Sequence, residues 1–137
     1  MVPDVGHRRS AVLASGNPHK LEELRTALPG WEVEALDRDD YPAETGSTYR
    51  ENAAAKARFG RLHAAADVWV VGEDSGIEVA ALGGGPGVES ARWAADGVAG
   101  MLDELAGETD RRARYVCVIV ALAAGGAAVE TEGVLEG

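Results

Sequence analysis

The fold class follows from residues 10–30, which read SAVLASGNPHKLEELRTALPG. The apolar run Ser10–Ala14 is typical of a short buried strand. Asn17 is a favourable residue just before a helix, and Pro18 suits the first helical position, where its missing N–H costs nothing. One face of that helix carries three leucines, Leu21, Leu24 and Leu28. A buried strand that passes through a short turn into an amphipathic helix indicates an α/β protein.

Later segments continue this alternation of strands and helices. Further strands are expected at Trp31–Leu36, Asp67–Val71, Arg114–Ala123 and Ala127–Leu135. Helices are expected over Tyr49–Ala66, where Thr48 and Glu51 form a capping box, and over Val98–Leu105. Residues Gly72–Gly76 are predicted to break the strand that starts at Asp67, and extended structure is predicted to resume at Ile77–Val79. The length fits one domain, so residues 1–137 are predicted to form a single α/β domain.

The composition narrows the functional classes. The formal net charge of −10 argues against a general nucleic-acid binder, because phosphate backbones require a basic surface. It does not exclude one bound nucleotide, particularly if a divalent metal ion accompanies it. No stretch approaches the ~20 apolar residues of a membrane span, and the N-terminus lacks the pattern of a signal peptide, so we expect a cytoplasmic protein with no membrane partner. Cys117 is the only cysteine, which excludes an internal disulfide, and its apolar neighbours predict a buried small side chain.

Lysine and asparagine are rare in this chain and occur close together. Of the 13 basic residues only Lys20 and Lys56 are lysines, and Asn17 and Asn52 are the only asparagines. A lysine is a compact point charge, whereas an arginine is a planar fork, so a site built for one does not readily accept the other. The two Asn/Lys pairs therefore suggest a binding site, and chance in a small sample is the other interpretation.

The first candidate site is the turn Ser15–Lys20 between the first strand and its helix. In open α/β sheets, ligands bind where strands end in this way. The free N–H groups and the dipole of a helix N-terminus favour an anion, and Gly16 lets a ligand approach the backbone. Lys20 lies one turn into the helix, within reach of a phosphate. The alternative is an ordinary capped helix with a solvated lysine.

Two further candidate sites follow later strands. Asn52 and Lys56, four residues apart, share one face of the helix behind the loop Glu44–Thr48, although an exposed, charged helix would also explain them. Glu73 and Asp74 come directly after a buried strand, where carboxylates are costly unless they are paired or hold a cation. Mg²⁺ binds such carboxylates together with substrate phosphates. A turn closed by side-chain hydrogen bonds is the alternative there.

Three motifs in this order resemble the inosine triphosphate pyrophosphatase family. They are SGNPHKLEEL at residues 15–24, ETGSTYRENAAAKA at 44–57 and EDSGIEVAALGGGPGVESARW at 73–93, of which the third is the most specific. The similarity is strong from Val12 to Arg92 and weak from Tyr115 to Gly137. It implies a mixed β-sheet flanked by helices, and a Mg²⁺-dependent hydrolase that converts ITP, dITP and XTP to monophosphate and pyrophosphate. It also suggests a homodimer.

The resemblance implies a role for each motif residue. Asp74 would bind Mg²⁺ and act as the base that prepares the attacking water, with Glu73, which replaces the commoner aspartate, assisting. Glu44 is the candidate second metal ligand, but the family often has its glutamate one residue earlier, at Ala43, so the second ligand is Glu44 or none. Arg92 either contacts phosphate or braces its loop. The substrate would be held by Ser15, Gly16, Asn17, Pro18, His19, Asn52, Lys56, Ser75 and, as the main cation, the catalytic Lys20.

The chain departs from the family at its C-terminal end. Family members continue past the position of Gly137 with a Phe-Gly-Tyr-Asp-Pro segment and a Ser-His-Arg segment, which select the purine, and neither occurs here. We therefore expect a C-terminally truncated member whose second lobe is incomplete. Two alternatives to the family reaction follow. One is a catalytically weak or inactive nucleotide-binding remnant, and the other is a related pyrophosphatase that acts on pyrimidine or modified nucleotides.

Overall fold

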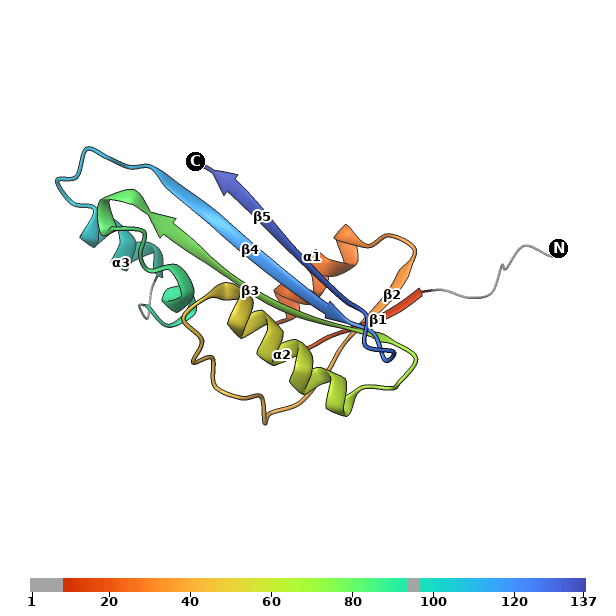
Figure 1. Cartoon of the computed structure of the whole chain (residues 1–137). Coiled ribbons are helices and arrows are strands. Elements are labelled where there is room, and N and C mark those ends of the chain that lie inside the picture. The colour runs from red at the N-terminus through yellow and green to blue at the C-terminus, as the bar shows by residue number, and fades with distance from the viewer. Residues whose placement is uncertain (1–8, 94–96) are drawn as a thin grey trace.

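The computed structural model describes residues 9–93 and 97–137, which form a five-stranded sheet with helices on both faces (Figure 1). The strand order is β2-β1-β3-β4-β5. β1 is parallel to both neighbours, whereas β3, β4 and β5 pair in antiparallel order, so the sheet is mixed, as predicted. The strands are β1 (Arg9–Leu13), β2 (Trp31–Ala35), β3 (Trp69–Val79), β4 (Ala113–Leu122) and β5 (Ala128–Glu136). The helices are α1 (Pro18–Ala27), α2 (Tyr49–His63) and α3 (Gly97–Glu104), with short 3₁₀ helices η1 (Ala80–Leu82) and η2 (Gly87–Arg92).

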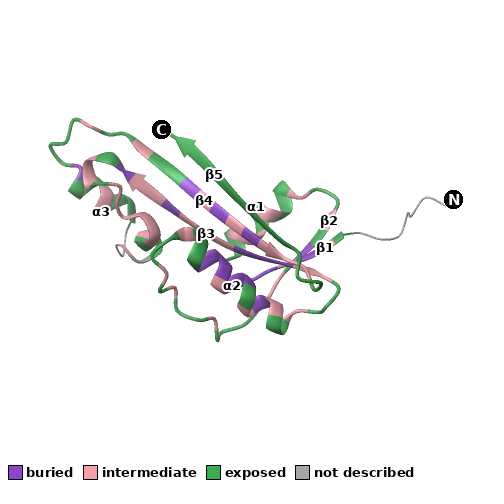
Figure 2. Ribbon diagram, in the orientation of Figure 1, coloured by how far each residue is buried: buried purple, intermediate pink, exposed green. Residues whose placement is uncertain are grey.

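Helices α1 and α2 cover opposite faces of the sheet. On one face, leucines of α1 pack against a small core made by Ala11, Leu13 and Val71. On the other face, alanines of α2 pack against valines of β4, namely Ala53, Ala54 and Ala57 against Val116, Val118 and Val120. Figure 2 shows the buried residues gathered in the central strands and on the inner side of α2, while β5 is exposed along its whole length. Because these core side chains are small, α2 can approach the sheet closely.

Strand β3 extends well past the C-terminal end of β1. Leu13, the last residue of β1, pairs with Val71, and β3 then continues beside β4 as far as Val79. The turn that leads into α1 starts at this same point. Ligands of open α/β sheets bind outside the carboxyl ends of the parallel strands. The N-terminus of α1 and the second half of β3 therefore share the edge at which a ligand is expected.

The predicted break at Gly72–Gly76 is wrong, because β3 runs through these residues without interruption. Gly72 and Gly76 do not form a turn; they allow neighbouring elements to pack closely against β3. A Cβ at Gly72 would lie 2.1 Å from the carbonyl oxygen of Ala53 in α2, and a Cβ at Gly76 would lie 2.2 Å from that of Gly87. Hence the chain places glycine where the backbones of two elements touch.

Helix α2 begins as predicted but is shorter. The Thr48 side chain accepts a hydrogen bond from the backbone N–H of Glu51, which confirms the capping box. The helix ends at His63, short of the predicted Ala66. The Arg61 guanidinium donates hydrogen bonds to backbone carbonyl oxygens of the turn that follows, and these bonds stabilise the turn in place of another helical turn.

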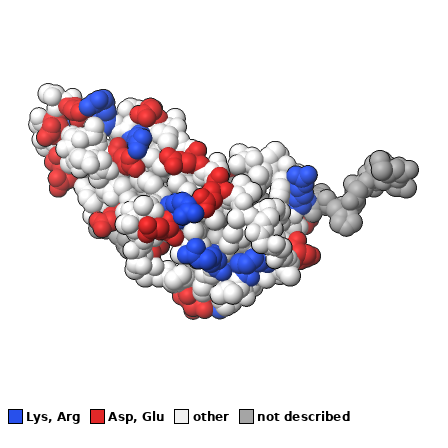
Figure 3. Space-filling model, viewed as in Figure 1, with Lys and Arg blue, Asp and Glu red and all other residues white. Residues whose placement is uncertain are grey.

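Charged side chains of both signs are interspersed over the face drawn in Figure 3, and no continuous basic surface is seen on it. Within residues 9–93 and 97–137, no helix has both the length and the apolar character needed to span a membrane.

Candidate active site

The turn into α1 has the capped geometry that the sequence predicts. The Asn17 side chain accepts a hydrogen bond from the backbone N–H of His19 at 2.9 Å, and Pro18 is the first helical residue. The Ser15 hydroxyl accepts a hydrogen bond from the Asn17 N–H at 3.1 Å. Residues 16–19 are exposed, and no atom lies within 4 Å of the Cβ position of Gly16. The turn therefore presents an open helix N-terminus, which suits an anion.

Lys20, on the first turn of α1, forms an ion pair with Glu73 of β3. The Lys20 Nζ lies 2.6 Å from Glu73 Oε2, and the pair is only partly exposed. Burial disfavours the ammonium charge, but the hydrogen bond and the charge of Glu73, together with the charges of Asp74 and Glu44, outweigh it and raise the pKa of Lys20. Lys20 is thus a fixed cation held at the edge of the sheet by a carboxylate.

Cys117 contacts this ion pair, and the prediction of a buried apolar cysteine needs correction. The residue is partly exposed, and its Sγ donates to Glu73 Oε1 across 3.5 Å. Burial and then the negative charge of Glu73 raise the pKa of the thiol to about 11. The thiol therefore stays protonated at neutral pH and serves as a hydrogen-bond donor to Glu73.

Asn52 and Lys56 lie inside the protein, so the interpretation of α2 as an exposed, charged helix at these positions is wrong. Asn52 is 2% exposed and Lys56 is 8% exposed. The Asn52 amide donates to Asp74 Oδ2 at 2.9 Å and accepts a hydrogen bond from the Gly46 N–H at 2.8 Å. Asn52 thus joins the loop before α2 to β3. The side chain leaves no room for a Cβ at Gly46, which would lie 2.5 Å from the Asn52 oxygen.

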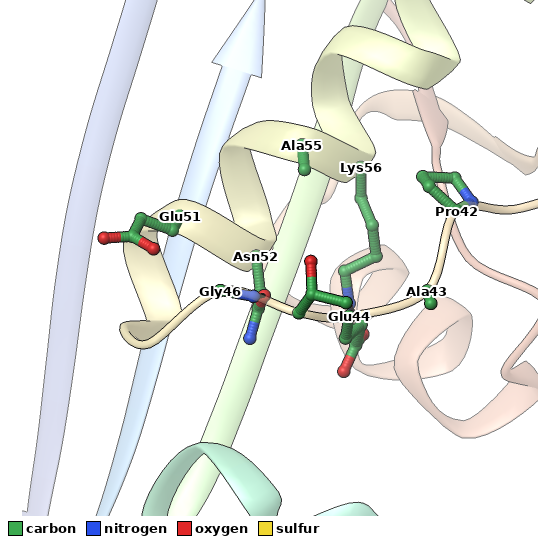
Figure 4. Close-up of a pocket in the computed structure, with 9 residues that line it drawn as sticks. Pro42, Ala43, Glu44, Gly46, Glu51, Asn52, Ala55 and Lys56 are labelled. Carbon is green, nitrogen blue, oxygen red and sulfur yellow. Dashed lines mark hydrogen bonds and ion pairs between the residues drawn. The ribbon is translucent and has the colours of Figure 1, made fainter.

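Lys56 points from α2 toward the preceding loop, where its Nζ lies 2.6 Å from Glu44 Oε1 (Figure 4). The loop and the helix enclose a pocket of about 140 Å³. Its lining includes Glu44, Ala43, Gly46, Asn52 and Lys56. The structure therefore places the candidate metal ligand Glu44 beside Lys56, one of the two lysines.

Asp74 lies beside this pocket and does not line it. The residue is 4% exposed, and its carboxylate accepts a hydrogen bond from the Asn52 amide. Burial raises the pKa of Asp74, the Asn52 hydrogen bond opposes this, and the charge of Glu44 raises the pKa further, while the charge of Lys56 lowers it. Asp74 is thus close enough to Glu44 and Lys56 for their charges to act on it.

Glu73 and Asp74 face opposite sides of the sheet, because successive side chains of a strand alternate. Glu73 meets α1 through Lys20, and Asp74 meets α2 through Asn52. The charges nevertheless form one group at the edge of the sheet, since both Asp74 and Glu44 raise the pKa of Lys20. We call this group the charge cluster. It consists of Lys20, Glu44, Lys56, Glu73 and Asp74.

Two carboxylates of the charge cluster have the chemistry of magnesium ligands. Among the side chains that the structure describes, no three His, Cys, Asp or Glu residues gather as a complete metal site. Asp74 and Glu44 do, however, offer two carboxylates close enough to interact. Mg²⁺ commonly takes one or two carboxylates and completes its octahedral shell with water and substrate phosphates. These residues are therefore suited to Mg²⁺ bound to a polyphosphate.

Tyr115, Tyr49, Glu78 and Arg114 were not predicted as site residues, and they surround the predicted Ser75 and the second half of β3. The Ser75 hydroxyl lies 2.8 Å from that of Tyr115 on β4. On the other face, Glu78 accepts hydrogen bonds from the Tyr49 hydroxyl and from Arg114, each at 2.8 Å. Tyr115 and Arg114 lie outside the three motifs, and only the pairing of β3 with β4 brings them to Ser75 and Glu78. The backbone of Arg92 ends η2, and its side chain lies outside the part of the structure that is described.

Comparison with known proteins finds a family model and relatives that match this chain. A model of the Ham1 family matches residues 11–137, a region that contains all three motifs. The dITP/XTP pyrophosphatase of Gloeobacter violaceus is 44% identical over 136 residues, which cover 94% of this chain and 68% of that protein. The dITP/XTP pyrophosphatase of Deinococcus radiodurans is 44% identical over 119 residues, which cover 82% of this chain and 58% of that protein.

A solved structure has the same architecture. The Ham1 protein of Staphylococcus aureus matches with a TM-score of 0.76 and 33% sequence identity, over 94% of this chain and 71% of that chain. The chain therefore spans only part of the length of each of these relatives, and 58% of the Deinococcus protein.

Proposed function

Because the chain belongs to the Ham1 family, we propose that it hydrolyses nucleoside triphosphates of the dITP, XTP and ITP type to monophosphate and pyrophosphate. The observation that carries this proposal is the charge cluster, in which two lysines and three carboxylates meet beside an open helix N-terminus. Pyrophosphate release needs these parts, because the triphosphate must be held and charge on the leaving group must be stabilised. The names of the relatives, dITP/XTP pyrophosphatases, support the substrate class.

The triphosphate would lie between α1 and α2. The turn Ser15–His19, exposed at residues 16–19, offers backbone N–H groups to phosphate oxygens, and Lys20 and Lys56 approach from the two faces of the sheet. Each lysine is already paired with a carboxylate, so it is fixed in place before the ligand arrives. In this proposal Glu73 positions Lys20 and is not a metal ligand, since it faces away from Asp74.

Asp74 and Glu44 are the residues that we propose to hold Mg²⁺. The ion, when bound, screens the phosphate charge and lowers the pKa of a coordinated water. The Asp74 carboxylate would accept a proton from the attacking water, whose oxygen forms a bond to the α-phosphorus as the bond to the bridging oxygen breaks. Pyrophosphate then leaves with its charge stabilised by Lys20 and Lys56, and the proton passes from Asp74 to solvent.

The raised pKa of Asp74 can be tested in the protein without Mg²⁺. Asp74 must be ionised to accept a proton, and burial raises its pKa above the usual value of an aspartate. In Mg²⁺-free buffer, an NMR titration of the Asp74 carboxyl should therefore have its midpoint above the usual pKa of an aspartate, and a midpoint at or below that value would contradict its buried position.

The proposal predicts which product appears. With Mg²⁺ and ITP, dITP or XTP, the protein should release pyrophosphate and the monophosphate, because attack at the α-phosphorus separates these two products. The test is a phosphorus NMR or chromatographic product analysis on a panel that also contains ATP, GTP and pyrimidine triphosphates. Release of orthophosphate and a nucleoside diphosphate would contradict the proposed reaction. A preference for pyrimidine nucleoside triphosphates would contradict the proposed substrate class.

Nucleotide binding without turnover is the second candidate function. The observation that favours it is that the residues matched make up 58% of the Deinococcus dITP/XTP pyrophosphatase. In that case calorimetry would detect a Mg²⁺-dependent affinity for the triphosphates, and product analysis would detect no pyrophosphate. Turnover above the background of the buffer would exclude this candidate.

A further inference from the structure

We propose that Tyr115 on β4 carries the nucleoside end of the bound nucleotide, with its ring as a platform for the base. This inference rests on the proposed function and extends it, because it names where the nucleoside lies once the triphosphate is held by the charge cluster. The residues that carry it are Tyr115, Ser75 and Glu73.

Tyr115 is on the same face of the sheet as the Lys20–Glu73 pair. Glu73 and Ser75 are two residues apart on β3 and so point to the same face. The Ser75 hydroxyl reaches the Tyr115 hydroxyl at 2.8 Å, and Cys117, two residues along β4, reaches Glu73. A continuous row of side chains therefore leads from Lys20 through Glu73 and Ser75 to Tyr115.

The spacing along this row suits a nucleotide. Tyr115 pairs in register with Ile77, which lies four residues beyond Glu73 on β3. At about 3.3 Å per residue, the ring is on the order of 13 Å along the sheet from the ion pair. This is the scale that separates the far phosphates of an extended nucleoside triphosphate from its base. The phosphates would thus be held at α1 while the base reaches β4.

Tyr115 has the exposure and the support that a stacking platform requires. The residue is 49% exposed, although it is part of a central strand pair. Its hydroxyl is hydrogen-bonded to Ser75, which fixes the ring before a ligand binds. Leu135, its neighbour in register on β5, is 73% exposed and extends the apolar surface on the same face. An exposed aromatic ring beside a phosphate site is the arrangement by which proteins stack nucleobases.

The test compares a nucleotide with inorganic tripolyphosphate. Calorimetry in Mg²⁺ would measure the Kd of α,β-methylene ITP, which cannot be cleaved at the α-phosphorus, and of tripolyphosphate, which lacks a nucleoside. For Tyr115→Ala we expect about tenfold weaker binding of the nucleotide or more, because a stacked base is lost, and no change for tripolyphosphate. Tyr115→Phe should bind both ligands within about threefold of the wild type, since the ring remains.

Val134→Ala is the matched control. Val134 pairs with Val116 and so faces the other side of the sheet, and at 45% its exposure is close to that of Tyr115. It should leave both affinities unchanged. The inference is overturned if Tyr115→Ala binds the nucleotide normally, if it loses both ligands equally, or if Tyr115→Phe loses as much as Tyr115→Ala. A wild-type protein that binds neither ligand would instead contradict the proposed function.

Discussion

Replacing Asp74 by asparagine is expected to lower the rate of pyrophosphate release by at least about 100-fold, because a positioned general base contributes roughly 10²–10⁴-fold to a rate. The amide of the variant can still accept the hydrogen bond that the Asn52 amide donates to Asp74 Oδ2 at 2.9 Å. It cannot, however, take a proton from water or add a negative charge for Mg²⁺. The measurement is steady-state release of pyrophosphate from ITP at saturating Mg²⁺.

The same variant should not be less stable, which separates a loss of chemistry from a loss of fold. The folded state raises the pKa of Asp74, mainly through burial. When the pKa of a carboxyl is higher in the folded than in the unfolded protein, folding disfavours its anion. At neutral pH the ionised carboxylate therefore reduces the free energy of unfolding. Asparagine removes that cost, and the Tm should stay equal or rise. Asp67→Asn, at an exposed aspartate just before β3, is the control and should change neither rate nor Tm. Full activity of Asp74→Asn would remove Asp74 from the mechanism.

Replacing Gly72 by alanine is expected to lower the free energy of unfolding by about 3 kcal/mol or more, since overpacking costs roughly 1–3 kcal/mol even where side chains can adjust. The added Cβ would lie 2.1 Å from the Ala53 carbonyl oxygen and 2.6 Å from the Ala57 nitrogen. Both are backbone atoms of α2, so the whole helix would have to move away from β3. The measurement is equilibrium unfolding in urea, with the wild type, Gly72→Ala and the control variant in the same buffer.

Gly133→Ala provides the matched control, because Gly133 also lies within a strand. No atom lies within 4 Å of its Cβ position, and its φ is not in the left-handed region. There the substitution should leave stability unchanged or raise it by up to about 1 kcal/mol, as it reduces the freedom of the unfolded chain. Equal effects at the two positions would contradict the close contact between α2 and β3. They would agree instead with an exposed turn at Gly72–Gly76.

Local signals in the sequence predicted most of the secondary structure. The predicted starts of α1 and α2 are confirmed, at Asn17 with Pro18 and at Thr48 with Glu51. Both starts depend on hydrogen bonds and backbone preferences that act within a few residues. The family resemblance is confirmed as well, because the Ham1 model matches residues 11–137. The mixed sheet that this resemblance implied is also present.

The interpretation of Gly72–Gly76 shows where local reasoning fails. Glycines next to carboxylates are typical of a turn, and nothing within the segment indicates that α2 will press against it. The contact comes from Ala53 and Ala57, which are distant in sequence. As a result, the sequence led us to treat Glu73 and Asp74 as a pair in one loop, whereas the strand directs them to opposite faces, Glu73 to Lys20 and Asp74 to Asn52.

The candidate site was predicted as a set of residue types but not as a geometry. The scarcity of lysine and asparagine singled out Lys20, Lys56 and Asn52. The two lysines belong to the charge cluster, and Asn52 donates a hydrogen bond to its Asp74. The burial of Lys56, its pairing with Glu44 and the contact between Cys117 and Glu73 depend on how α1 and α2 pack on the sheet. Tyr115 could not be found from motifs at all, because only strand register brings it to Ser75.

The central claim is that Lys20 and Lys56, which approach from opposite faces of the sheet, hold one and the same triphosphate. Its most direct test is the Kd of tripolyphosphate with Mg²⁺ for Lys20→Met, Lys56→Met and the double variant, with Arg58→Met, at an exposed position of α2, as control. We predict that each single change weakens binding about tenfold or more, and that the two effects are coupled by more than about 0.5 kcal/mol, because residues that share a ligand are not independent. Unchanged affinity in either single variant, or effects that simply add, would contradict the account.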